Sequence, residues 1–403
     1  MPLIAHDDAT LASDAEAITG LHQAFEAQRR DFTAHPHSTL EERSQRIGAL
    51  AMMMLGNRDR IRRAVSEDFA VHPELFTDLI ECLGIAGRAQ FALSQLPQWM
   101  ADEERYADPA LYGDGKAFVR HQPKGVVGNI PPWNFPFDIG VGPVVEMLAA
   151  GNRVIIKPSD YTPACGELLA SMVRDAFDPL HVTVVTGGVE LARTFPTLPW
   201  DHLLYTGSPN IGREVMKAAA ANLTPVTLEL GGKCPAILLD DAVEMRAVAN
   251  ILGTKMIKNG QMCISVDYVL VPRARMGEFV DLALRYAREN VPGYSRGDDC
   301  TGIITERHLD RLLAPAGGRC GLRGRRPGGG RPGEPRNPAD APVPGARPGG
   351  RARPHAGGDL RSAAPGEALP RRHRGHLLHQ RRRAAAGPLR LRRRRCRDPA
   401  GAG

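Results

Sequence analysis

The chain lacks several features that would assign it to a protein class at once. Residues 1–314 contain no GxGxxG motif, and the 403-residue chain has no apolar run long enough to cross a membrane and no metal-site spacing of His, Cys and carboxylates. The seven cysteines are scattered and odd in number, which argues against a disulfide framework. Residues 1–30 lack the apolar segment of a signal peptide. We therefore expect a cytoplasmic protein with reduced cysteines, no membrane span and no bound metal.

Residues 315–403 lack Lys, Ile, Met, Phe, Tyr and Trp altogether. Arg, Gly, Pro and Ala supply 67 of these 89 positions. Such a segment buries too little apolar surface to offset the entropy of ordering it, so we predict a disordered tail. The tail holds 22 Arg against 5 acidic residues, whereas residues 1–314 hold 30 basic and 40 acidic residues. The pI near 9.2 therefore reflects the tail, and the rest of the chain is acidic.

Cys263 is the residue that carries the most chemical information. It lies in GQMCIS (260–265), downstream of Glu229 in LELGGK (228–233), so one region supplies a nucleophile and a base. A thiol enzyme needs a partner that manages protons and water, and a carboxylate can fill that role. In most sequences such a pair is only a buried Cys and a solvent-exposed Glu without a chemical role. Further motifs favour a catalytic role here.

Short apolar runs predict buried strands at 125–130, 153–157 and 182–185. Asn134, in PPWNFP (131–136), follows the first of these runs. A carboxamide at such a turn can donate a hydrogen bond to a developing oxyanion, although a turn-forming Asn without a chemical role is common.

Two further turns follow predicted strands. Lys157 and Asp160 lie in KPSD, just beyond the strand end where doubly wound folds bind ligands. Gly207 and Ser208 lie in YTGS and precede a predicted helix at 209–221, whose N-terminus would attract phosphate. Apolar spacing also predicts a helix at 40–66.

The motifs PWNFP, KPSD, YTGS, LELGGK and GQMC occur in the order and spacing of the aldehyde dehydrogenase superfamily, and the chain resembles it from about residue 20 to about 314. Residues 24–61 look most like the branch of coniferyl aldehyde dehydrogenases and class 3 enzymes. The resemblance implies an α/β fold. Residues 1–228 would form N-terminal helices and a Rossmann-like parallel-sheet cofactor domain, and 229–314 an incomplete α/β catalytic domain.

The resemblance also implies roles for individual residues. Cys263 would attack the aldehyde carbon, Asn134 would hold the alkoxide, and Glu229 would activate the water that releases the carboxylate. NAD or NADP would accept the hydride. The cofactor would be held by Trp133, Lys157, Asp160, Gly187, Gly207, Ser208 and Gly212. A thiol esterase using Cys263 and Glu229 is an alternative, which ester turnover independent of NAD would reveal.

Two interpretations of residues 315–403 compete. Arg-rich disorder binds nucleic acid through counterion release, but this tail has no aromatic side chain to stack on bases. Alternatively, the tail is the family's C-terminal half read out of frame. Starting each triplet one base later permits MREEIFGPL from residues 355–363 and DGERPLALYVFG from 381–392, and both strings resemble family motifs. We favour a frameshift near codon 314 and expect no specific nucleic-acid partner.

A frameshift would remove parts that intact relatives use. The Glu of the EEIFGP-like string holds the nicotinamide ribose in the family, and its position here falls near Gly357 and Gly358. The strand that relatives use to form homodimers would be lost as well. We therefore expect little turnover from this chain and regard its dimerisation as doubtful.

Overall fold

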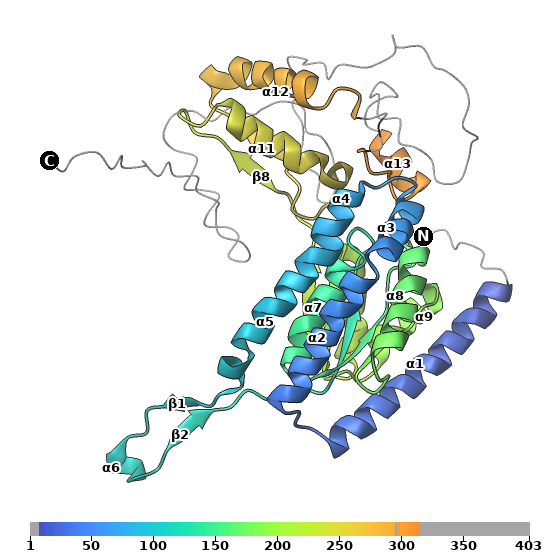
Figure 1. Cartoon of the computed structure of the whole chain (residues 1–403), viewed down its shortest axis with the longest axis vertical. Helices are drawn as coiled ribbons and strands as arrows, with labels where there is room; N and C mark the ends of the chain where they lie inside the picture. The colour runs from blue at the N-terminus through green and yellow to red at the C-terminus, as the bar shows by residue number, and fades with distance from the viewer. Residues whose placement is uncertain (1–7, 295–296, 298, 314–403) are drawn as a thin grey trace.

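The centre of the molecule is a five-stranded, all-parallel sheet in the order β5-β4-β3-β6-β7 (Figure 1). The computed structural model describes residues 8–294, 297 and 299–313. The strands are β3 (Val126–Ile130), β4 (Arg153–Ile156), β5 (Val182–Val184), β6 (His202–Gly207) and β7 (Val226–Leu230). The predicted α/β class and the three predicted strands are confirmed. The predicted disordered tail lies outside the described residues.

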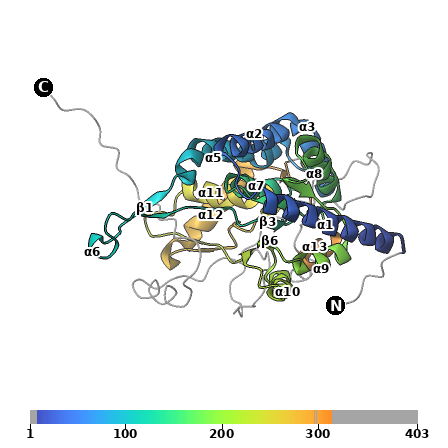
Figure 2. The same ribbon diagram turned by 90° about the horizontal axis from the view of Figure 1, so that it is seen from below.

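Helices cover both faces of this sheet, because its central strands are apolar on both sides (Figure 2). On one face α7 (Asp138–Ala149) and α8 (Pro163–Ala176) pack on the strands, and α2 (Leu40–Gly56), α3 (Arg58–Phe69) and α5 (Gly84–Met100) pack on these helices. The other packs against α1 (Asp8–Ala34), α9 (Val189–Thr194) and α10 (Pro209–Ala220). The helix predicted at 209–221 is confirmed as α10. No helix within the described residues has the length and apolar character needed to span a membrane.

The prediction of a single helix at 40–66 is wrong in one respect, because the chain forms two helices there. Asn57 separates α2 from α3 with a non-helical ψ of 12°. Its side-chain Nδ2 donates to the carbonyl of Met53 at 2.8 Å, which competes with continuation of the helix. The start of α2 is fixed by a capping box between Thr39 and Glu42.

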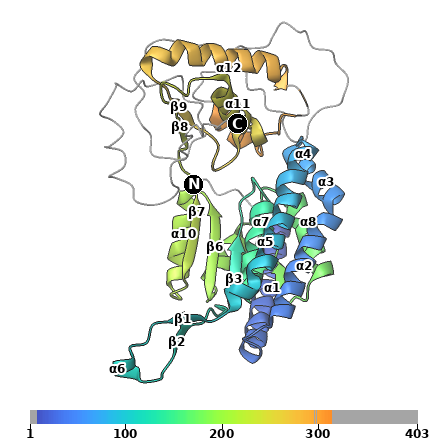
Figure 3. The ribbon, with the colours of Figure 1, turned by 60° about the vertical axis from the view of Figure 1, so that its left-hand side comes forward.

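Residues that follow β7 form a second, smaller part of the molecule (Figure 3). Here β8 (Pro235–Ile237) pairs in parallel with β9 (Tyr268–Leu270), and α11 (Met245–Met256) packs on α12 (Met276–Asn290). The predicted boundary between residues 228 and 229 falls inside β7. The chain then returns to the first part, where Ile303 and Ile304 are buried.

The remaining elements are short. A hairpin of β1 (Glu103–Arg105) and β2 (Ala117–Val119), with α6 (Pro109–Tyr112) at its tip, projects away from the sheet (Figure 1). The others are α4 (Glu74–Phe76), η1 (Thr77–Leu83), η2 (Phe195–Thr197), η3 (Ile257–Gly260), η4 (Arg273–Arg275) and α13 (Glu306–Leu313). All the residues of the β1 and β2 strands are exposed.

Candidate active site

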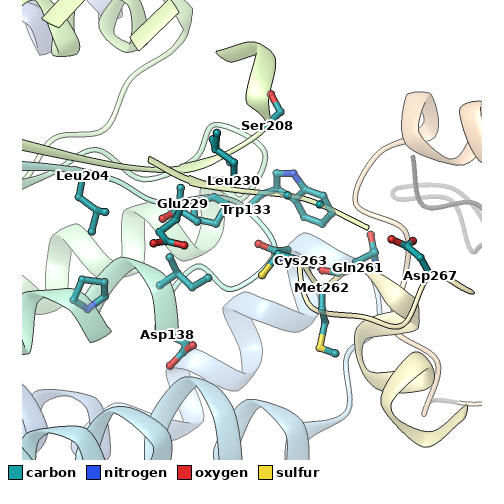
Figure 4. A pocket seen from close by; sticks show the side chains of 18 of the residues that line it. Trp133, Asp138, Leu204, Ser208, Glu229, Leu230, Gln261, Met262, Cys263 and Asp267 are labelled. Carbon is teal, nitrogen blue, oxygen red and sulfur yellow. Dashed lines mark hydrogen bonds between the residues drawn. The ribbon is translucent and has the colours of Figure 1, made fainter. Parts of the chain in front are cut away.

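A cavity of about 460 Å³ lies where the second part of the molecule meets the sheet (Figure 4). Six of the ten predicted site residues line it: Trp133, Asn134, Gly207, Ser208, Glu229 and Cys263. They come from four separate segments of the chain. The fold therefore brings together residues that are up to 130 positions apart in the sequence.

Glu229 reaches this cavity from the edge strand of the sheet. In the register of β6 and β7 it stands beside Thr206, while Leu204 stands beside Thr227. Alternate residues of a strand share a face, so these side chains lie on one face of the two strands. On that face α7 packs against β3 and β4, and Glu229 is left exposed.

Cys263 lies in a loop that follows η3, and its side chain is exposed. Within η3, just before this loop, Lys258 and Asn259 have φ of 49° and 53°, a left-handed conformation that is uncommon for residues other than Gly. The Sγ of Cys234 donates to the backbone carbonyl of Cys263 at 3.3 Å. The loop is thus preceded by two residues in a strained backbone conformation, and Cys234, the residue before β8, contacts its backbone.

Gln261 ties the Cys263 loop to the returning segment of the chain. Its Nε2 donates to the carbonyl of Gly302 at 2.8 Å, and its Oε1 accepts from the N–H of Ile304 at 3.1 Å. The backbone carbonyl of Gln261 accepts from Nδ2 of Asn134 at 2.9 Å. The candidate oxyanion donor and the nucleophile loop are therefore joined directly. Sequence reasoning quoted Gln261 within GQMC but gave it no role.

A buried ion pair also holds the two loops together, and sequence reasoning missed it. Nζ of Lys258 lies 2.8 Å from Oε1 of Glu81 and also donates to the carbonyl of Asn134. Oε2 of Glu81 accepts from the N–H groups of Phe137 at 3.0 Å and Asp138 at 2.7 Å. Glu81 belongs to no motif. Lys258 is one of several polar residues in this segment, so the local sequence did not single it out.

The predicted cofactor residues divide into two groups. Gly207 and Ser208 line the cavity, and Oγ of Ser208 caps α10 by accepting from the N–H of Ile211 at 3.3 Å. A Cβ atom at Gly207 would collide with the Tyr205 hydroxyl, so only glycine fits there.

The other four predicted cofactor residues do not line the cavity. Lys157 is 3 % exposed and donates to the carboxylate of Asp160 at the carboxyl end of β4. Gly187 packs against α1, where a Cβ atom would lie 3.0 Å from Oδ1 of Asp14. Gly212 lets α10 approach Leu230 of β7. The last two glycines therefore have packing reasons of their own.

The far end of the cavity carries two charged groups, from Arg88 of α5 and Asp138 of α7. Burial and the nearby Glu81 carboxylate raise the pKa of Asp138 to about 6. Arg88 pairs through Nε with Glu146 at 3.0 Å. Neither residue was predicted from the sequence: Arg88 lies in no recognised motif, and Asp138 follows PPWNFP closely but was given no role.

Comparisons with known proteins show which family the chain is similar to. The profile described as "Aldehyde dehydrogenase family" matches residues 8–315. A probable coniferyl aldehyde dehydrogenase of Caulobacter vibrioides is 37% identical over 304 residues, covering 75% of this chain and 62% of that protein. One of Pseudomonas aeruginosa is 39% identical, covering 76% and 64%. The chain thus spans less than two thirds of the length of these curated relatives.

Solved structures give the same result. The substrate-bound AldH of Staphylococcus aureus superposes with a TM-score of 0.70 at 27% identity, covering 74% of this chain and 65% of that one. An aldehyde dehydrogenase of Mycobacterium tuberculosis complexed with NAD+ gives 0.66 at 26% identity, covering 74% and 62%. The resemblance found in the sequence motifs is confirmed, including the likeness to coniferyl aldehyde dehydrogenases.

Proposed function

Because the chain belongs to the aldehyde dehydrogenase family, we propose that its cavity is built to oxidise an aldehyde to a carboxylate with NAD or NADP. The observation that carries this proposal is the convergence of Cys263, Glu229 and Asn134 on one cavity from three separate segments. A nucleophile, a base and an amide donor are the groups that this reaction needs.

Cys263 begins the reaction by attacking the aldehyde carbon with its sulfur. The alkoxide that forms accepts hydrogen bonds from Nδ2 of Asn134 and from the backbone N–H of Cys263. Nδ2 carries two N–H bonds and gives one to Gln261, so a second remains for the substrate. The hydrogen bond to Gln261 fixes the position of the amide before the substrate arrives.

The end of the cavity at Gly207 and Ser208 fits a nicotinamide dinucleotide. The helix α10 begins there, so its N-terminal dipole favours a phosphate, and Gly207 leaves room for a close approach. When bound, the cofactor supplies a hydride acceptor. Loss of the hydride leaves an acyl thioester on Cys263, and Glu229 then takes a proton from the water that hydrolyses it.

The substrate class follows from the relatives and from the lining of the cavity. Several relatives are named for coniferyl aldehyde, and the walls here are largely apolar, with Trp133, Ile139 and Leu204 among them. A volume of about 460 Å³ lies within the range of roughly 300–1,000 Å³ that suits small organic ligands. We propose an aromatic or long-chain aldehyde.

The proposal can be tested on a half-reaction that needs no turnover. A nitrophenyl acetate ester should acylate Cys263 and release a burst of nitrophenol from the purified chain. Cys263→Ala should show no burst. Glu229→Gln should keep the burst but retain the acetyl group on Cys263, as mass spectrometry of the peptide would show.

The hydride step needs a separate measurement with aldehyde and NAD. One equivalent of NADH or less is expected from Glu229→Gln, and none from Cys263→Ala. Acetylation of another cysteine in place of Cys263, or equal acetyl release from wild type and Glu229→Gln, would contradict the assigned roles. Ester turnover without any aldehyde-dependent NADH would favour the thiol esterase.

A further inference from the structure

The cavity runs along one face of β6, and its two ends differ in chemistry. Leu204 and Thr206 alternate along the strand, Ser208 directly follows its end, and all three line the cavity. Glu229 stands beside Thr206, between the ends. In Figure 4, Ser208 and Asp138 lie on opposite sides of Cys263 and Glu229. If the cofactor occupies the Ser208 end, the opposite end receives the rest of the aldehyde.

This substrate end is apolar except for two charged head groups. Its walls are formed by Ile139, Pro143 and Leu204, and the charges belong to Asp138 and Arg88. An aromatic ring or alkyl chain would be desolvated favourably against such walls. Any polar group on the substrate would have to meet one of the two charged side chains.

Asp138 is held in place by its backbone, while its carboxylate is left without a donor. Its N–H donates to Oε2 of Glu81 at 2.7 Å, at the start of α7. Among the described residues no hydrogen bond reaches its carboxylate oxygens, which feel only burial and nearby charges. A half-buried carboxylate of this kind is stabilised when a ligand donates a hydrogen bond to it.

Arg88 does not supply that donor, although it lies close by. A Cβ atom at Gly142 would collide with Nη1 of Arg88 and lie 3.9 Å from Oδ1 of Asp138. The absent side chain at Gly142 is therefore what lets the Arg88 head group approach α7. Nε of Arg88 is engaged by Glu146 at 3.0 Å, which draws the guanidinium toward the next turn of the helix. Asp138 lines the cavity, and its Oδ1 lies near the start of α5, 3.8 Å from the position of a Cβ atom at Gly84.

We propose that Asp138 selects aldehydes that carry a hydroxyl group at the far end of an apolar body, and phenolic aldehydes in particular. The phenol O–H donates to the Asp138 carboxylate, while the ring fills the apolar space between Asp138 and Cys263. This proposal rests on the proposed function, since it assumes that Cys263 binds the carbonyl. Asp138 here determines specificity and takes no part in the bond changes at the carbonyl.

The test uses protection of Cys263 in the full chain without cofactor. The purified protein is treated with iodoacetamide in the presence of 3-phenylpropanal or 3-(4-hydroxyphenyl)propanal, and Cys263 alkylation is followed by peptide mass spectrometry. The saturated spacer separates the hydroxyl from the carbonyl, so both aldehydes have similar reactivity toward a thiol. The quantity compared is the ratio of half-protecting concentrations.

In wild type the hydroxylated aldehyde should protect at about tenfold lower concentration, as expected for a hydrogen bond to a charged group. Asp138→Leu should bring the ratio near one, and Asp138→Asn should leave an intermediate ratio because its amide oxygen still accepts. The exposed Asp175→Asn is the matched control and should keep the wild-type ratio. Circular dichroism would show whether each variant folds.

The outcomes separate this inference from the proposed function. A wild-type ratio near one, or an unchanged ratio in Asp138→Leu and Asp138→Asn, would overturn the role of Asp138 and leave the proposed function intact. Failure of both aldehydes to protect Cys263 in wild type would overturn the proposed function and this inference with it.

Discussion

Lys258 and Glu81 form an ion pair with 2.8 Å between Nζ and Oε1, and neither side chain is exposed to solvent. The pair joins η1 to η3, which precedes the loop that carries Cys263. Nζ also lies 4.8 Å from the ring centre of Phe69 and 4.4 Å from that of Phe135. These contacts compensate part of the cost of burying the ammonium group.

Removing one partner of this pair should destabilise the protein strongly. Lys258→Met leaves a buried carboxylate without its cation, so we expect a loss of about 3–5 kcal/mol in the free energy of unfolding. The double variant Lys258→Met with Glu81→Gln should lose less than the sum of the single variants. Urea unfolding followed by tryptophan fluorescence would measure both effects.

The matched control for that experiment is the exposed pair of Lys217 and Glu214, with 2.9 Å between charged atoms. Lys217→Met should change the free energy of unfolding by less than about 1 kcal/mol, because surface ion pairs contribute little. Equal effects of Lys258→Met and Lys217→Met would show that the buried pair is not important for stability.

His72 should make stability depend on pH. Burial, with Lys258 nearby, lowers its pKa to about 3, and the ring nitrogen Nδ1 lies 2.8 Å from Oγ1 of Thr301. The unfolded chain binds a proton at His72 below about pH 6.5 while the folded chain does not, so stability falls as the pH falls from about 6.5 to about 3. Between pH 7 and pH 5 this loss is about 2 kcal/mol.

The measurement is the difference in unfolding free energy between wild type and His72→Gln at pH 7, 6 and 5. Asp138 acts in the opposite direction, since its raised pKa makes stability fall as the pH rises toward about 6. The difference between the two proteins cancels that contribution. Parallel pH curves for wild type and His72→Gln would show that His72 titrates normally in the folded chain.

The pair of Lys157 and Asp160 should favour NAD over NADP. Asp160 neutralises the ammonium group of Lys157, which would otherwise attract the additional phosphate of NADP. The Asp160 carboxylate can instead accept a hydrogen bond from the ribose hydroxyl of NAD. We expect NAD to bind about tenfold more tightly by titration calorimetry. Asp160→Ser should reduce the difference in affinity between NAD and NADP, whereas the exposed Asp241→Asn should leave it unchanged. Tighter binding of NADP to wild type would contradict this assignment.

The chain as written should show little or no steady-state aldehyde oxidation, because the string that supplies the ribose-binding Glu in relatives is absent from residues 355–363. Resequencing the gene across codons 300–330 would show whether one base is spurious. Restoring the alternative frame should then restore turnover. Robust aldehyde-dependent NADH production by the unaltered chain would refute this expectation.

Local patterns were sufficient to predict much of this molecule. The strands β3, β4 and β5 are short apolar runs that end in turn residues, and Ser208 is an N-cap followed by a helix, so each is encoded within a few positions. The motifs around Cys263, Glu229 and Asn134 identified three residues that line one cavity.

The contacts that hold the site residues in place could not be predicted from local patterns. Glu81 meets Lys258 across 177 positions, and Gln261 meets Gly302 across 41. A local sequence pattern cannot predict such pairs, because helices and loops far apart in the sequence must first pack together to bring the partners into contact. The break at Asn57 was missed for a different reason, since the apolar spacing continues across a residue whose side chain stops the helix.

The bonds from Gln261 to Gly302 and Ile304 set a limit on how far the gene can be shortened. Both partners lie upstream of residue 314, where the composition changes, so the brace of the nucleophile loop is encoded entirely in the portion that resembles the family. A version ending soon after α13 would keep every anchor of the Cys263 loop described above. A version ending before Thr301 would lose the hydrogen bonds of Gln261 to Gly302 and Ile304, while the five-stranded sheet and the contacts of the loop with Asn134 and Glu81 would keep their residues.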